Sequence, residues 1–163
     1  MIILLAITLA VAGKLEDGWR GIPYGPASVL DTAPTDSCRK ADDHSVLWAC
    51  QEQVADVPVT VYYMGSEGWY HGVTLRAVGF SECATLFTTL TAAWDAPWTE
   101  KEYASGPLPD GWWNLMASNK RTSAAWTYNR YSDTCSAFTM NRGISAKIDA
   151  KKAERAASAA ESL

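Results

Sequence analysis

The stretch of sequence that decides the fold is residues 57–94, which read VPVTVYYMGSEGWYHGVTLRAVGFSECATLFTTLTAAW. Mostly apolar residues occupy every second position along 57–64 and again along 69–78. The short segment Gly65–Gly68 separates the two runs and has the composition of a turn. Strict alternation over this length is typical of half-buried β-strands. The stretch therefore predicts an antiparallel hairpin with one face in the core.

The period of the pattern changes after this hairpin. The apolar residues now recur at helical spacing and form one stripe, namely Cys83, Leu86, Phe87, Leu90 and Trp94. Ser81 is suited to cap a helix that begins there, and Pro97 is suited to stop it. We therefore expect an amphipathic helix over 81–94 that packs on the core face of the sheet.

The rest of the chain adds more strands to this unit. The same alternation predicts strands at about 45–53, 112–117, 123–128 and 134–141. Residues 27–43 predict a loop with at most one helical turn, and the proline-rich residues 95–110 predict a long loop of the kind that often carries binding residues. The fold class that we predict is α+β: an antiparallel sheet of about five strands packed by one central helix, plus an Ala/Lys-rich C-terminal helix.

The two ends of the chain differ in character from its body. Residues 1–12 are an apolar run too short to span a bilayer, and Ala10-Val11-Ala12 fits a small-x-small cleavage pattern. We expect a signal peptide over 1–12, although no Lys or Arg precedes it; an uncleaved hydrophobic first strand or helix is the alternative. Residues 13–144 then form a single α+β domain. Residues 145–163 should form a solvated helix, or a weak partner-binding tail, because nearly all its apolar residues are Ala.

The composition limits the classes of function. The chain has 163 residues, 48% of them apolar and 20% charged, which suits one globular domain. The net charge of −4 argues against a nucleic-acid-binding surface and supplies no polybasic patch for a membrane. With the signal region at residues 1–12, we expect an exported protein, periplasmic or secreted, with no transmembrane span after signal cleavage.

Four cysteines support export, because an even number in an exported chain suggests disulfides. They are Cys38, Cys50, Cys83 and Cys135. Four cysteines allow three connectivities, and we favour Cys38–Cys50 because these two are close in sequence and flank a polar loop. Cys83–Cys135 is then the second bridge. A zinc site is the alternative, but no C-x-x-C spacing supports it.

The segment after the signal region also carries a distinctive motif. Residues 19–25 read Trp-Arg-Gly-Ile-Pro-Tyr-Gly, which excludes a helix, and Trp19, Ile22 and Tyr24 are suited to hold this extended piece on the core. With the hairpin, the helix and the aromatic strand 126–129, this motif resembles a group of small exported bacterial proteins of unassigned function. They open with an aromatic-Arg-Gly-Ile-Pro-aromatic-Gly segment. The resemblance implies a periplasmic or envelope protein and supplies no catalytic residue.

No sequence motif points to catalysis or to a cofactor. His44 and His71 are the only histidines, and no G-x-S-x-G, H-E-x-x-H or phosphate-binding loop occurs. We expect no cofactor and no metal. Acidic residues do gather around the long loop and keep a small hydrolase as the weakest alternative; they are Asp95, Glu100, Glu102 and Asp110.

The aromatic residues are the strongest remaining signal. Many of them should fill the core, but flat exposed rings can also stack on sugars or anchor a protein partner. Adjacent strand residues face opposite ways, so one of Trp112 and Trp113 must lie off the helix-covered face. The binding candidates are Trp69, Tyr70, Trp98, Trp112 and Trp113. We predict a non-enzymatic protein that binds a protein or glycan partner in the envelope; a carbohydrate- or peptidoglycan-binding module is the alternative.

Overall fold

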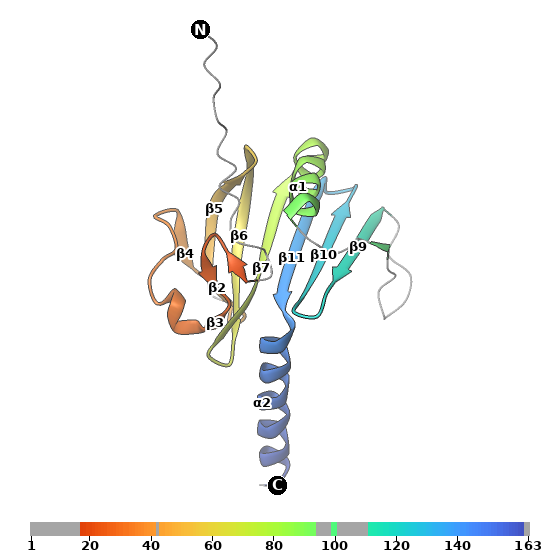
Figure 1. Cartoon of the computed structure of the whole chain (residues 1–163). Coiled ribbons are helices and arrows are strands. Elements are labelled where there is room, and N and C mark those ends of the chain that lie inside the picture. The colour runs from red at the N-terminus through yellow and green to blue at the C-terminus, as the bar shows by residue number, and fades with distance from the viewer. Residues whose placement is uncertain (1–16, 42, 94–98, 101–110, 162–163) are drawn as a thin grey trace.

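The computed structural model describes residues 17–41, 43–93, 99–100 and 111–161, with only the backbone at 99, 100, 112, 113 and 161. Most of the elements are strands, joined by short connections (Figure 1). In chain order the elements are β1 Gly18–Trp19, β2 Ile22–Pro23, β3 Gly25–Pro26, the 3₁₀ helix η1 Ala27–Leu30, β4 Cys38–Lys40, β5 Val46–Val54, β6 Val57–Ser66, β7 Trp69–Val78, α1 Phe80–Ala93, β8 Thr99–Glu100, β9 Trp112–Ser118, β10 Thr122–Asn129, β11 Thr134–Asn141 and α2 Arg142–Glu161.

One large antiparallel sheet dominates the molecule. Its strands follow the order β4-β5-β6-β7-β11-β10-β9-β8, and β3 also pairs with β7, while β1 and β2 form a small separate sheet. The predicted fold class, about five strands packed by one central helix, is therefore wrong: the protein is mostly β, with a wider sheet. The missed strands β1 to β4 and β8 are two or three residues long, which is too short to show alternation.

The central hairpin and helix form where the sequence places them. β6 runs two residues past the predicted end, so the turn is only Glu67–Gly68, and both residues have positive φ (54° and 82°). Such two-residue turns match the twist of paired strands. α1 buries Cys83, Leu86 and Leu90 as predicted. Trp94 lies outside the described residues.

The sheet has two faces, which strand register defines. The core face carries rows such as Val61, Leu75, Ala137 and Trp126, and most of its side chains are buried. α1 covers one part of this face, with the Phe87 ring 5.0 Å from that of Trp126. Residues 17–30, which we call the strap, cover another part of it, and Trp19 and Leu30 are buried there. The predicted attachment of Trp19, Ile22 and Tyr24 to the core is confirmed.

The opposite face, which we call the outer face, consists of the alternate residues of β4 to β7 and β9 to β11. None of the described helices lies across its middle, because α1 and the strap occupy the core face and α2 leaves the end of the sheet (Figure 1). α2 begins at Arg142, three residues earlier than predicted. It buries Ile144 and Ile148, and residues 149–160 are exposed, as predicted.

Candidate binding surface

One of the five predicted binding residues, Tyr70, does not lie on the surface. Tyr70 is fully buried, with its ring 5.1 Å from that of Tyr24 and 6.0 Å from that of Tyr63, so it is not a surface residue. The cause is a register shift between β6 and β7, which leaves His71 without a strand partner. One extra residue exchanges the faces of all residues beyond it. The alternation along 73–77 therefore does not extend to Tyr70.

The other four candidates are placed to different extents. Trp69 is partly exposed. Lys147 Nζ of α2 lies 5.0 Å from the centre of the Trp69 ring, so α2 contacts this side chain. The backbones of Trp112 and Trp113 begin β9, but their side chains lie outside the described part of the chain, as does all of Trp98. These three remain predictions.

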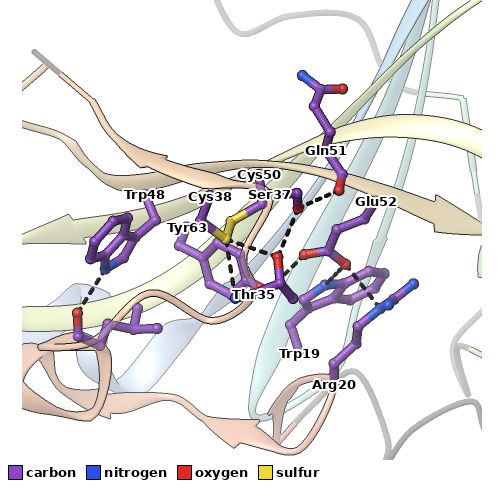
Figure 2. The surroundings of a disulfide bond; sticks show 11 residues. Trp19, Arg20, Thr35, Ser37, Cys38, Trp48, Cys50, Gln51, Glu52 and Tyr63 are labelled. Atoms are coloured by element: carbon purple, nitrogen blue, oxygen red, sulfur yellow. Dashed lines mark hydrogen bonds and ion pairs between the residues drawn. A yellow bond between two sulfur atoms is a disulfide. The ribbon is translucent and has the colours of Figure 1, made fainter.

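Both predicted disulfides are present. Cys38–Cys50 joins β4 to β5, and Cys83–Cys135 joins α1 to β11. Figure 2 shows the surroundings of the first bridge, where the Ser37 hydroxyl donates to the Gln51 carbonyl oxygen at 2.6 Å. Disulfides persist in oxidising compartments. The first bridge also explains β4, because it fixes this short edge strand to its neighbour.

A buried carboxylate near that bridge escaped the sequence analysis. Glu52 is 8% exposed, and its oxygens accept hydrogen bonds from Tyr63 Oη at 3.0 Å and Trp19 Nε1 at 3.4 Å (Figure 2). Arg20 Nε lies 2.9 Å from the same carboxylate and Arg20 also bonds to the Gln53 carbonyl. The sequence does contain a signal for this burial: Glu52 lies two residues after Cys50, so both side chains point to the same face of the strand. With three donors and little exposure, it anchors the strap.

Buried tyrosines surround this anchor and remain protonated. Burial raises the pKa of Tyr24 to about 12, and the Tyr24 hydroxyl lies 2.8 Å from the Thr139 hydroxyl. Burial and then the charge of Glu52 raise the pKa of Tyr63 well above its usual value. Burial has the same effect on the pKa of Tyr70. The Tyr24 hydroxyl therefore attaches the strap to β11, and the Tyr63 hydroxyl holds Glu52 in place.

Of the histidines and acidic residues considered for chemistry, the structure describes the side chains of only His44 and His71. His44 is exposed, and burial followed by the charge of Lys152 lowers the pKa of His71. Within the described ranges, no three His, Cys, Asp or Glu side chains gather in a way that could hold a metal ion. The acidic loop residues Asp95, Glu102 and Asp110 lie outside those ranges, and Glu100 is described only in its backbone.

The outer face brings together a surface that the sequence analysis did not single out. Two rows of side chains cross the strands at adjacent levels. The first row is Ala49, Tyr62, Thr74, Phe138, Ala125 and Met116. The second row is Gln51, Thr60, Arg76, Ser136, Thr127 and Asn114. All are partly or fully exposed except Ala49 and Asn114, and this makes the outer face the candidate binding surface.

Hydrogen bonds across the second row hold its polar side chains in place. Gln51 Nε2 donates to Thr60 Oγ1 at 3.2 Å, and Thr127 Oγ1 donates to Asn114 Oδ1 at 3.3 Å. Each bond links neighbouring strands, so the pair at each end of the row is held across its two strands. The sequence contained a signal for this row, because its side chains are the polar residues of each alternating run.

Comparison of the chain with models of protein families, with curated proteins and with solved structures found no match. Of the helices that the structure describes, none combines the length and apolar character needed to cross a membrane.

Proposed function

We propose that this is a non-enzymatic exported protein that binds a macromolecular partner along the outer face of its sheet. The observation that carries the proposal is the first row, in which Tyr62 and Phe138 are partly exposed on the same face of the sheet and separated by one strand. Aromatic side chains supply large contact areas at a low entropic cost. A sheet several strands wide offers an extended partner a long, continuous contact.

The two disulfides support the proposed compartment. Two bridges are expected in an oxidising environment and are rare in the cytosol. We therefore keep export, to the periplasm or the exterior, as part of the proposal. Signal cleavage after Ala12 also belongs to it, although residues 1–16 lie outside the described chain.

Affinity capture from envelope extract tests the location of the site. The bait proteins are wild type, a Tyr62→Ser, Phe138→Ser double variant, and a control with Val29→Ser and Tyr131→Ser. The control residues are exposed at 41% and 68% and lie off the outer face. We expect a protein or glycan that wild type and control retain and the double variant loses. Equal retention by all three would move the site elsewhere, and no specific retention would remove the binding function.

A further inference from the structure

The arginines of this protein fall into two groups. Five of them contact partners on the chain: Arg20 with Glu52, Arg121 with Asp17, Arg130 with Tyr131, Arg142 with the Asn119 carbonyl, and Arg155 with Glu67. Only the guanidinium groups of Arg39 and Arg76 lack a hydrogen bond or ion pair with any residue that the structure describes. Both are exposed.

These two arginines share the outer face. Arg39 pairs with Ala49, next to Tyr62 in the first row, and Arg76 lies in the second row. They are three strands apart, which corresponds to roughly 14 Å across the sheet at the usual strand spacing, and they also lie one row apart along the strands. The register places no Asp or Glu among the described side chains of this face. A chain with net charge −4 thus presents a face on which the charged groups among the described side chains are guanidinium groups.

The remaining side chains of the outer face are suited to sugars. Hydroxyl and amide groups dominate the second row, and such groups can both donate to and accept from sugar hydroxyls. Tyr62 and Phe138 are separated by β7, hence by roughly 10 Å. Rings at this spacing on a flat surface could stack on alternate units of an extended glycan.

We propose that the outer face binds a glycan chain that carries carboxylates, such as a chain of uronic acid units. This inference rests on the proposed function and names the partner of the same face. The glycan crosses the strands along the two rows, stacks on Tyr62 and Phe138, and places carboxylates on Arg39 and Arg76. A guanidinium group binds a carboxylate through two parallel hydrogen bonds, so arginine suits this task better than lysine.

An acidic protein fits this face less well. Protein interfaces have an apolar, well-packed centre. The large apolar side chains that the structure shows as well exposed are Val29, Val78, Phe80 and Tyr131, of which only Val78 belongs to the outer face, at the end of β7. The centre of the face instead mixes the two rings of Tyr62 and Phe138 with polar side chains, namely Thr60, Thr74 and Ser136.

The experiment is a titration of the full chain with polygalacturonate, in which every sugar carries a carboxylate. Its fully methyl-esterified form tests the need for charge, and poly-L-glutamate tests a peptide source of carboxylates. The arginine variant is a double substitution, Arg39→Gln with Arg76→Gln. The control is a second double substitution, Lys120→Gln with Lys152→Gln, which removes the same charge from exposed sites off the outer face. Isothermal titration calorimetry at moderate salt measures affinity.

We expect wild type and control to bind polygalacturonate alike and the arginine variant to bind at least tenfold more weakly. Equal binding by the arginine variant, or equal binding to the esterified chain or to poly-L-glutamate, would overturn the inference. If polygalacturonate is not bound while extract capture still depends on Tyr62 and Phe138, the inference fails and the proposed function stands. If both measurements are negative, both fail.

Discussion

α1 and the strap cover the same face of the sheet, but different forces hold them there. α1 presents a periodic apolar stripe and is tied by a disulfide. The strap has only two-residue strands, and directional contacts from Trp19, Arg20 and Tyr24 attach it to the sheet. The attachment of α1 is therefore distributed over many apolar atoms, whereas the strap adds a few polar contacts to a smaller apolar burial.

The largest effect should follow removal of the disulfide of α1. Cys83–Cys135 closes a segment of 52 residues and Cys38–Cys50 one of 12. The loop-entropy relation gives a loss of about 4 kcal/mol for the first bridge and about 3 kcal/mol for the second. Urea unfolding of the two double-alanine variants measures both losses. A greater loss at the shorter loop would show that local geometry, rather than loop length, sets the contribution.

The apolar stripe of α1 should contribute nearly as much. Leu86 is fully buried under the helix. Leu86→Ala should lower the free energy of unfolding by about 3 kcal/mol, because it removes buried methyl groups and leaves a cavity. Thr88→Ala on the exposed side of the same helix is the control and should change it by about 0.5 kcal/mol at most. Similar small losses in both variants would contradict the packing of α1 on the sheet.

These two elements also mark how far the sequence predicts the structure. Alternation and helical periodicity predicted the central hairpin, α1 and the last strand, because each pattern extends over many residues, and closeness in sequence predicted the cysteine pairing. They missed β4 and β8, whose few residues become strands through their neighbours. They also placed Tyr70 on the surface, because a single bulge shifts the register without any signal in the alternation.

The candidate surface was predictable only in part. Its side chains are the polar half of the alternating runs, so their common face follows from the sequence. That Arg39 belongs to this face does not, because it requires the pairing of β4 with β5. The unpartnered state of Arg76 likewise depends on where every acidic side chain lies in the fold.

The charge of Glu52 should matter most to the strap. Glu52→Gln keeps the shape of the side chain but removes the charge that Arg20 and Tyr63 share. Because the Arg20 side chain is 43% exposed, water compensates part of the lost ion pair. We expect a loss of about 2 kcal/mol in stability.

Hydrogen exchange separates this local effect from a global one. Amide protons of the strap should exchange faster in the Glu52→Gln variant, while those of α1 should change only as much as the overall stability does. The control Gln53→Glu adds a charge on the opposite face of β5 and keeps the Gln53 carbonyl that Arg20 contacts. Unchanged exchange in the strap would show that its apolar contacts suffice to hold it.

The smallest effect, and one of opposite sign, should come from the hydroxyl of Tyr70. This oxygen is buried and has no hydrogen-bond partner within the described chain. Tyr70→Phe should therefore leave stability unchanged or raise it by up to about 1 kcal/mol. Tyr63→Phe, which removes a hydroxyl that does donate to Glu52, should instead lower it by about 1 kcal/mol.

The pH dependence of stability at alkaline pH also tests the burial of Tyr70. Burial raises the pKa of Tyr70 in the folded protein above its ordinary value of 10.0, so the folded state holds this proton more tightly than the unfolded state. The corresponding stability is fully present below pH 10 and is lost as the pH rises above it. Each tyrosine with a raised pKa in the folded state makes the free energy of unfolding fall by at most about 1.4 kcal/mol per pH unit. Urea unfolding between pH 9 and 11 should therefore show a shallower loss for Tyr70→Phe than for wild type. Parallel curves would mean that Tyr70 ionises as readily in the folded chain as in the unfolded one, and that the strap does not seal it from water.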